Sequence, residues 1–253
     1  MRPLENKVAL VTGSSRGIGA AIARAFAAAG ARVAVHGRDA AAAESVRADI
    51  DGAGGHALPF LADLTQFEAI EAMRLAIEER LGPVEVLVTN GGGNRFAPPG
   101  ALEDIDPAAW QATLDANLTA TFLTVKSFLP GMKSRRTGSI ITLSSAAARQ
   151  PSGHSPAPYA AAKAGIQLLT QILALQAGPF GIRANCIAPG TILTERNAQR
   201  IPQAQQEKLA ASHPVPRLGT PLDVASAALF LACEQSSWIT GTVLDIAGGS
   251  VMR

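Results

Sequence analysis

The sequence has few cysteines, few aromatic residues and little excess charge of either sign. Only 2 of its 253 residues are cysteine and 4% are aromatic. Cys186 and Cys233 stand in apolar surroundings without the spacing of metal ligands, so we interpret both as small buried hydrophobic residues and expect no metal site. The net charge of +2 at pH 7 comes from scattered basic residues, which argues against a nucleic-acid-binding protein.

Long hydrophobic runs are missing as well. No stretch approaches the ~20 apolar residues that a membrane helix needs, and the first residues lack an apolar segment of signal-peptide length. We therefore expect a cytoplasmic protein. Because 47% of the residues are hydrophobic, the chain can form one large core, and we expect a single domain over residues 1–253.

Short β-branched runs alternate with longer stretches of helical periodicity, which is typical of βαβ units. After the first run, Ile18, Ile22 and Phe26 recur once per turn of a helix that we expect to end near Gly30. The pattern predicts an α/β, doubly wound (Rossmann-type), mostly parallel seven-stranded sheet with helices on both faces. The predicted strands are residues 8–11, 32–35, 56–61, 84–88, 139–143, 182–187 and 243–246.

Polar residues predict where three further helices begin. We expect Asp39 to begin the second helix, and Thr65 with Glu68 to form a capping box at the third. Thr220, followed by a proline and Asp223, marks the last long helix.

The longest irregular region predicted from the sequence spans about residues 190–218, where Pro202, Pro214 and Pro216 interrupt any helical pattern. In a compact domain a segment of this length is usually a lid or a binding loop. We expect it to be a substrate lid.

A glycine-rich turn, residues 12–19 with the spacing G-x3-G-x-G, follows the first predicted strand and opens the first helix. Glycines at this junction let the backbone approach a pyrophosphate, while the helix N-terminus supplies N–H groups and a positive dipole. We expect a dinucleotide here. A tight turn that needs glycine for its geometry alone is the structural alternative.

The end of the second predicted strand favours NADP(H) over NAD(H). An acidic residue at the strand tip would bind the ribose hydroxyls of NAD, but Gly37 occupies that position and Arg38 follows it. Arg38 together with Arg16 of the glycine turn would suit a 2′-phosphate. Asp39 weakens this prediction slightly, although it is equally well placed to cap the next helix.

The only tyrosine, Tyr159, stands four residues before Lys163, on one face of a predicted helix. A phenol with a pKa of about 10 is a poor acid or base at neutral pH, and a lysine one turn away favours the phenolate. Ser144 and Ser145 end the fifth predicted strand, at the edge where open α/β sheets bind ligands, and Asn117 precedes that strand. A surface helix pair with capping and turn residues is the alternative interpretation.

These motifs, taken in order, resemble the short-chain dehydrogenase/reductase family over almost the whole chain and are similar to those of β-ketoacyl-acyl-carrier-protein reductases. The resemblance rests on residues 12–19, 63–64, 90–92, 117, 145, 159, 163, 185–194, 217–221, 239–241 and 248–249.

The resemblance implies hydride transfer between a nicotinamide cofactor and a carbonyl or alcohol. Tyr159 would be the general acid in the reductive direction and Ser145 would orient the carbonyl. Lys163 would bind the nicotinamide ribose and lower the pKa of the phenol, while Asn117 would anchor a proton relay. The cofactor contacts implied besides Tyr159 and Lys163 are Gly13, Ser15, Arg16, Gly17, Ile18, Gly19, Arg38, Asp63, Leu64, Asn90, Gly91, Pro189, Gly190, Ile192 and Thr194, the last four around the nicotinamide carboxamide.

Two departures from the family pattern stand out. After the fourth strand the chain has Thr89-Asn90-Gly91-Gly92 where the family usually has Asn-Asn-Ala-Gly, and we expect the extra glycine to loosen the cofactor floor. The interval from Ser145 to Tyr159 is one residue longer than usual, and we expect residues 150–156 to border the substrate mouth.

The substrate is less well defined. An acyl-carrier protein is a candidate partner, because Arg135 and Arg136 would hold an acidic protein if they lie beside the site. However, Pro179-Phe180 stands where such enzymes often have a second basic residue. An NAD-dependent alcohol or sugar dehydrogenase and a non-catalytic nucleotide-binding sensor are the alternatives.

Apolar residues also recur on the outer side of the helices around Asn117 and Tyr159, where subunits of this family pair. The resemblance therefore implies a homotetramer, and burial within one subunit is the alternative. The residues concerned are Phe122, Phe128, Leu168 and Leu175.

Overall fold

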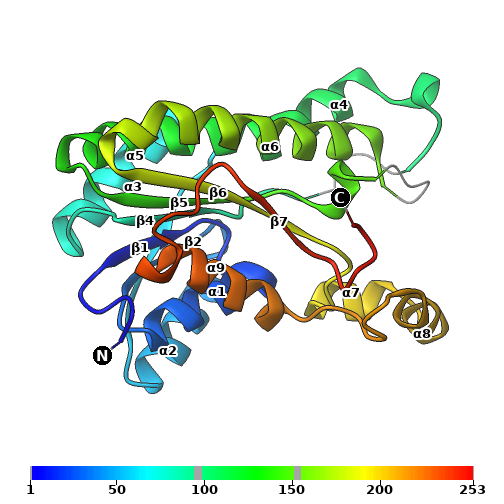
Figure 1. Cartoon of the computed structure of the whole chain (residues 1–253), viewed down its shortest axis with the longest axis horizontal. Helices are drawn as coiled ribbons and strands as arrows, with labels where there is room; N and C mark the ends of the chain where they lie inside the picture. The colour runs from blue at the N-terminus through cyan, green and yellow to red at the C-terminus, as the bar shows by residue number, and fades with distance from the viewer. Residues whose placement is uncertain (1, 94–98, 151–154, 253) are drawn as a thin grey trace.

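The structure, a computed structural model, describes residues 2–93, 99–150 and 155–252. At its centre seven parallel strands form one sheet in the order β3-β2-β1-β4-β5-β6-β7 (Figure 1). This confirms the predicted doubly wound fold, and the strand bounds differ from the predicted ones by at most two residues. The strands are β1 Val8–Val11, β2 Arg32–Gly37, β3 His56–Leu61, β4 Val86–Thr89, β5 Gly138–Leu143, β6 Ile182–Pro189 and β7 Val243–Ile246.

Helices cover both faces of the sheet (Figure 1). On one face lie α1 Gly17–Ala28, α2 Ala40–Gly52 and α9 Pro221–Ala232. On the other lie α3 Phe67–Arg80, α5 Ala120–Arg135 and α6 Ala157–Ala177, with α4 Pro107–Leu114 against one end of α6.

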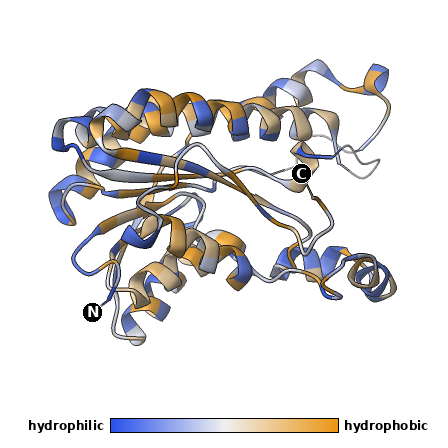
Figure 2. Ribbon diagram, in the orientation of Figure 1, coloured by the Kyte–Doolittle hydropathy of each residue, from blue (hydrophilic) through white to orange (hydrophobic). Residues whose placement is uncertain are grey.

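Each face has its own apolar cluster, and hydrophobic and hydrophilic residues alternate along the covering helices (Figure 2). Phe26 of α1, Val46 of α2 and Leu231 of α9 are buried in one cluster. Ile70 of α3 and Phe128 of α5 are buried in the other. The expectation that Phe128 is an outer residue is therefore wrong, because it faces the sheet and is only 2% exposed.

Two of the three predicted helix starts are confirmed. The Asp39 carboxylate accepts the Ala42 N–H at the start of α2, and Thr220 and Asp223 form a capping box at α9. The capping box predicted for Thr65 is wrong, since α3 begins after Gln66 and the Thr65 hydroxyl donates instead to Asp63.

The segment 190–218 is more regular than predicted. It contains α7 Glu195–Arg200 and α8 Gln203–Ser212, which lie beyond the carboxyl ends of β6 and β7 (Figure 1). The prolines permit this because Pro202 is the residue before α8 and Pro214 follows its end, so neither removes a hydrogen bond from the helix interior.

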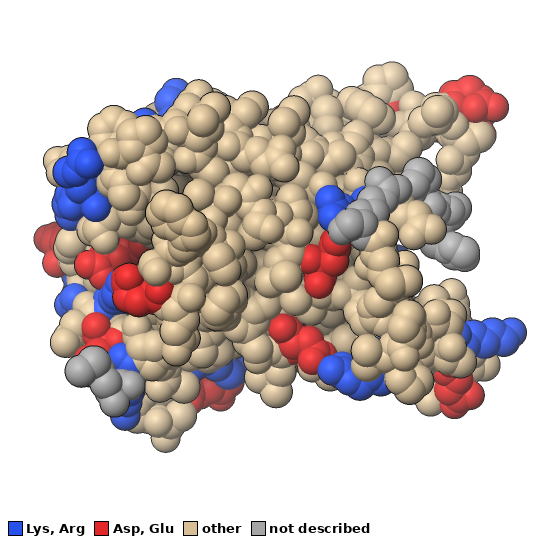
Figure 3. Space-filling view, viewed as in Figure 1, with Lys and Arg blue, Asp and Glu red and all other residues tan. Residues whose placement is uncertain are grey.

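The surface carries little charge of one sign. On the face shown in Figure 3, basic and acidic side chains alternate around a large uncharged area. No helix in the described parts of the chain is long and apolar enough to span a membrane. Among the described residues, no three His, Cys, Asp or Glu side chains gather as a metal site would require.

Candidate active site

The glycine-rich turn lies where the strand order reverses, at the carboxyl ends of β1 and β4. Gly13 and Gly17 have φ of +62° and +55°, values that disfavour other residues. A Cβ at Gly19 would lie 2.3 Å from the Gly13 carbonyl oxygen, so glycine is required there for close packing. The first N–H groups of α1, including that of Ile18, have no intrahelical partner, and the turn presents them to an anion.

The loop after β4 braces this turn. The Asn90 Nδ2 donates to the carbonyl oxygens of Thr12 and Gly13, both at 3.0 Å. The backbone N–H groups of Asn90 and Gly91 donate to the Thr12 hydroxyl. Leu64, after β3, packs against Gly91, where a Cβ would lie 2.9 Å from its Cδ1. Predicted contacts from three strands therefore meet at one edge of the sheet.

Gly92, which matches the glycine of the family pattern, lies against Asn117, and the loosening expected from the extra glycine of this loop stays a prediction. Gly92 has φ of +125°, and a Cβ there would lie 2.5 Å from Asn117 Oδ1. Because Gly92 has no Cβ, Asn117 Oδ1 can accept the Gly93 N–H and Asn117 Nδ2 can donate to the Gly93 carbonyl, both at 3.0 Å. Asn117 is fully buried in a π-helical turn, Asp115–Thr119, between α4 and α5. The structure thus shows Asn117 fixing this loop, and the proton relay stays a prediction.

The tip of β2 carries the residues predicted to select the cofactor. A Cβ at Gly37 would lie 2.9 Å from Ser15 Cβ and Oγ, so Ser15 occupies the space that a larger residue would need. The exposed Arg16 forms an ion pair with Asp39, with 2.5 Å between Nη2 and Oδ2. Asp39 therefore caps α2 and holds Arg16 at the same time.

Arg38 and Asp63 lie close enough to interact at this tip. The pKa of Asp63 is lowered mainly because its carboxylate accepts hydrogen bonds from the Thr65 N–H and then from the Thr65 hydroxyl. The positive charge of Arg38 lowers this pKa further. The acidic side chain expected beside the adenine is thus held by its own loop.

Tyr159, Lys163 and Ser145 are brought together by α6 and the end of β5. The Lys163 Nζ lies 5.7 Å from the centroid of the Tyr159 ring and donates to the Leu143 carbonyl at 2.8 Å. Tyr159 is hydrogen-bonded to Ser145, whose Oγ also accepts the Ala147 N–H at 3.2 Å. The three side chains can therefore act on one carbonyl.

Burial raises the pKa of the Tyr159 phenol, and the hydrogen bond with Ser145 offsets only part of this. The direction is opposite to the lowering expected from Lys163. Lys163 is itself almost completely buried, and this desolvation lowers its pKa to about 8, against a smaller opposing effect of Cys186. In this structure the phenol is protonated at neutral pH, which is the form that donates a proton to a carbonyl.

Ser144 has a different place from Ser145. Its hydroxyl donates to the Lys163 carbonyl at 2.8 Å and accepts from Gln167 Nε2 at 3.0 Å. Because Ser144 is buried and both hydrogen bonds hold α6 against β5, Ser145 is the hydroxyl available to a substrate.

The predicted nicotinamide segment follows β6. The Gly190 N–H donates to the Ile246 carbonyl, and Ile192 is buried and paired with Gly219. The Thr194 hydroxyl accepts the Asn197 N–H at the start of α7. A Cβ added at Gly17 would lie 3.3 Å from Thr194 Cγ2, so the two ends of the predicted dinucleotide site approach each other. Pro189 is the last residue of β6.

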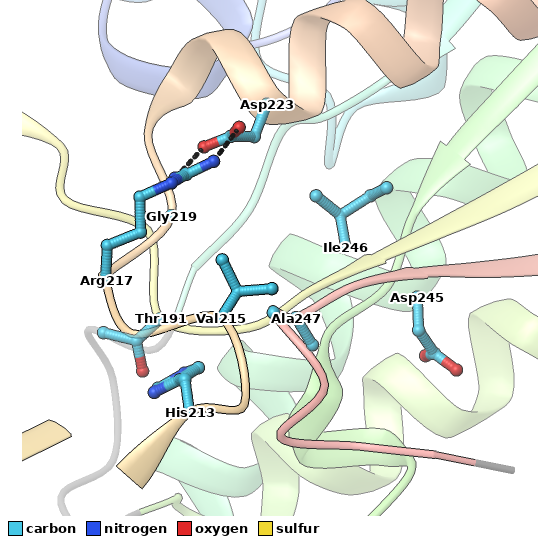
Figure 4. Close-up of a pocket in the computed structure, with 10 residues that line it drawn as sticks. Thr191, His213, Val215, Arg217, Gly219, Asp223, Asp245, Ile246 and Ala247 are labelled. Carbon is cyan, nitrogen blue, oxygen red and sulfur yellow. Dashed lines mark hydrogen bonds and ion pairs between the residues drawn. The ribbon is translucent and has the colours of Figure 1, made fainter. Parts of the chain in front are cut away.

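A cavity of about 250 Å³ lies behind that segment, near the end of β7 (Figure 4). His213, Thr191 and the ion pair of Arg217 with Asp223 line it, and the predicted site residues do not. We therefore do not assign it to the candidate active site.

Two further expectations concern the surroundings of the site. Residues 151–154, most of the predicted substrate mouth, lie outside the described residues. Arg135 and Arg136 precede β5 and donate to the carbonyls of Val84 and Pro179. Since Ser145 follows the same strand, the two arginines lie at the opposite edge of the sheet from the site, and they do not border its mouth within this chain.

Sequence reasoning missed His36. It is the residue before Gly37, and its imidazole contacts the glycine turn directly. The available signal was a polar side chain at the end of an otherwise apolar strand.

The sequence from residue 13 to 250 matches the family described as enoyl-(acyl carrier protein) reductase. A 3beta-hydroxysteroid dehydrogenase 1 of Eggerthella lenta is 40% identical over 255 residues, covering 98% of this chain and 95% of that protein. The (2S)-[(R)-hydroxy(phenyl)methyl]succinyl-CoA dehydrogenase subunit BbsD of Thauera aromatica is 37% identical over 249 residues, covering 97% of each.

Solved structures agree over the same length. A 3-oxoacyl-[acyl-carrier protein] reductase from Brucella melitensis superposes with a TM-score of 0.94 at 33% identity, covering 100% of this chain and 94% of that one. A 7 alpha-hydroxysteroid dehydrogenase complexed with NADH has a TM-score of 0.92 at 35% identity, covering 99% and 96%. A gluconate 5-dehydrogenase from Burkholderia cenocepacia, in complex with NADP and tartrate, has a TM-score of 0.89 at 32% identity, covering 97% and 95%.

Proposed function

The chain belongs to the short-chain dehydrogenase/reductase family and is an NAD(P)-dependent oxidoreductase of CH–OH and C=O groups, and on that premise we propose that it reduces a ketone with NADPH. The observation that carries the proposal is the gathering of Tyr159, Ser145 and Lys163 at the same edge of the sheet as the glycine turn. A protein that only senses a nucleotide has no use for all three.

The site fits a nicotinamide dinucleotide. Gly13, Gly17 and Gly19 leave the backbone of the turn open at a helix N-terminus, where a pyrophosphate is favoured. Bound there, the cofactor would supply the hydride, with Pro189, Gly190, Ile192 and Thr194 around its nicotinamide.

The protein's own residues would supply orientation and the proton. Ser145, whose Oγ accepts the Ala147 N–H and whose hydroxyl is hydrogen-bonded to Tyr159, would donate its hydroxyl proton to the substrate oxygen instead once a substrate is bound. Tyr159, protonated at neutral pH, would give its phenolic proton to the oxygen as negative charge develops there. Lys163, with a pKa of about 8, would keep an ammonium for the ribose hydroxyls and for stabilising the phenolate that results.

NADPH is preferred in this proposal because of the β2 tip. Arg38 is exposed there, Arg16 is held nearby by Asp39, and the Ser15 side chain leaves no room for an acidic residue at position 37. Similar structures hold NADH in one case and NADP in another, so overall similarity does not decide the cofactor. The residues at the tip carry the argument.

A β-ketoacyl thioester is the substrate class we favour. One relative is named for a succinyl-CoA derivative and one similar structure for an acyl-carrier-protein substrate. An acyl-carrier protein bound at Arg135 and Arg136 would have to deliver its acyl group from the opposite edge of the sheet. A coenzyme A thioester therefore fits the site of a single subunit better than an acyl-carrier-protein thioester does. An NAD-dependent sugar or alcohol dehydrogenase, which performs the same kind of reaction, is the second candidate.

Subunit contacts and a lid complete the proposal. Phe122 of α5 and Leu168 and Leu175 of α6 are 46%, 60% and 79% exposed, which suits pairing of these helices in a homotetramer. Light scattering that gives a monomer would contradict the tetramer.

We further propose that residues 190–218 close over the substrate. Because Cys186 and Cys233 are free thiols, we also propose that the enzyme works in the cytoplasm.

The proposed reaction is tested by following the absorbance of the reduced cofactor. Native protein is mixed with NADPH or NADH and a panel of acetoacetyl-CoA, cyclic ketones and keto-sugars. The proposal expects oxidation of NADPH with a β-ketoacyl thioester at a kcat/KM above that with the other ketones. Faster turnover of a polyol with NAD would favour the second candidate instead.

A further inference from the structure

Among the described residues, His36 is the one buried imidazole that touches the phosphate-binding turn. It is the fifth residue of β2, is 3% exposed, and accepts the Gly13 N–H at its Nδ1, with 3.0 Å between the two nitrogens. Its Nε2 lies 3.1 Å from the Ala62 carbonyl oxygen, after β3. The ring therefore joins the turn after β1 to the loop after β3.

These two contacts leave only one tautomer. A backbone N–H can only donate, so Nδ1 must be the unprotonated acceptor, and a carbonyl can only accept, so Nε2 must carry the proton. A doubly protonated ring would set two N–H groups against each other at Gly13. The arrangement requires a neutral imidazole with its proton on Nε2.

The backbone of His36 adds two more bonds to the same turn. Its N–H donates to the Ser14 hydroxyl at 2.9 Å, and its carbonyl accepts the Ser14 N–H at 2.8 Å. Consecutive N–H groups of Gly13 and Ser14 are thus both directed at His36. The amides that follow in the turn and at the start of α1 are left to face a ligand.

We propose that His36 is a positioning residue for the cofactor, whose Nε2–H tautomer, fixed by Ala62, orients the Gly13 N–H and sets the direction of the turn's remaining amides toward the pyrophosphate. This rests on the proposed binding of a nicotinamide dinucleotide. His36 does not touch the reacting atoms, so its loss should change the KM for NADPH and leave kcat at saturation nearly unchanged.

Three variants separate positioning from simple packing. His36→Asn keeps an acceptor at the place of Nδ1, His36→Leu removes it, and Val35→Ala is a control that removes buried packing on the same strand without touching the turn. One hydrogen bond is worth about tenfold in binding. We expect His36→Leu to raise the KM and Kd of NADPH about tenfold, His36→Asn to recover most of that loss, and Val35→Ala to lower Tm alone.

The tautomer is read directly on the unmutated protein by ¹⁵N NMR of labelled histidine, with the His36 signals assigned by their absence in His36→Asn. An Nε2–H tautomer at neutral pH supports the proposal, and an Nδ1–H tautomer or a protonated ring overturns it even if His36→Leu fails to fold. Equal NADPH affinity of native protein, His36→Asn and His36→Leu also overturns it. If the native protein binds no dinucleotide while the Nε2–H signal is present, the proposed function fails and the tautomer assignment stands.

Discussion

The two sides of the candidate site are built differently. On the nucleotide side, the turn after β1 is held by Asn90, His36 and the positive-φ Gly13, all tied to backbone groups of the sheet. On the proposed substrate side, α7 and α8 contain no buried residue among those described. The nucleotide side is thus preorganised by the sheet, whereas α7 and α8 of the proposed substrate side bury no described side chain.

This contrast explains why similar folds act on different compounds. Relatives and similar structures are named for a steroid, a CoA thioester and gluconate. A short exposed helix can change sequence at little cost in stability, while the turn cannot, since a Cβ at Gly19 would meet the Gly13 carbonyl. Substrate specificity can therefore diverge around one cofactor site.

The largest effect on turnover should come from Tyr159, which lies between the cofactor and the substrate in the proposed site. Tyr159→Phe removes the phenolic proton and should lower kcat about 10³-fold, because general acid catalysis contributes that much. Binding of NADPH, measured by fluorescence titration, should change little. Loss of cofactor binding together with turnover would show that Tyr159 has a structural role.

The pH dependence of stability sharpens the account of the nucleotide side. Burial lowers the pKa of His36 from 6.5 to about 4. The hydrogen bond with Ala62 and the charge of Asp63 oppose this lowering, and the charge of Arg38 adds to it. Above pH 6.5 the imidazole is neutral in both the folded and the unfolded chain, so its protonation does not change the free energy of unfolding. As the pH falls from 6.5 to 4, only the unfolded chain takes up the proton, so the free energy of unfolding should fall by about 3 kcal/mol.

Urea titrations across that pH range measure this loss, with His36→Asn as the matched control. The variant should lose less stability than the native chain between pH 6.5 and 4. Parallel curves for the two proteins would mean that other groups cause the pH dependence.

Cofactor choice should respond to the β2 tip alone. Arg38→Ala removes an exposed cation from the proposed 2′-phosphate site, so the ratio of kcat/KM for NADPH over NADH should fall about tenfold. Arg200→Ala, on α7 of the substrate side, should leave the ratio unchanged. An unchanged ratio in Arg38→Ala would make the NADPH assignment wrong.

The smallest effects come from a matched pair of acidic residues, one on each side. Asp39→Ala removes the cap of α2 and releases Arg16, so it should cost about 1 kcal/mol of stability and tighten NADPH binding. Glu207→Ala on α8 loses the contact with Gln203 and should change stability by less than about 0.5 kcal/mol. Thermal unfolding measures both, and equal losses would remove the contrast between the two sides.

The fold and most of the site could be predicted from the sequence because they depend on local patterns. Apolar strand runs, Asp39 as a helix cap and glycines at a strand-to-helix junction are visible in one dimension. The predictions for Thr65 and Phe128 failed for a shared reason, since each depends on which neighbour the folded chain supplies. Sequence spacing does not contain that information.

The electrostatics of the site were the least predictable part. The spacing of Tyr159 and Lys163 indicated a lowered phenol pKa, but burial by the surrounding helices raises it. The two contacts of His36 likewise join segments 23 and 26 residues away in the sequence. Both effects arise only when distant strands and helices pack together.

The most direct test of the central claim is a calorimetric titration of the native protein with NADPH. A dinucleotide held by the glycine turn predicts one saturable site per chain, lost or strongly weakened in Gly19→Ala while that variant keeps its cooperative unfolding. Absence of saturable binding for both NADPH and NADH, or undiminished binding in folded Gly19→Ala, would contradict the account.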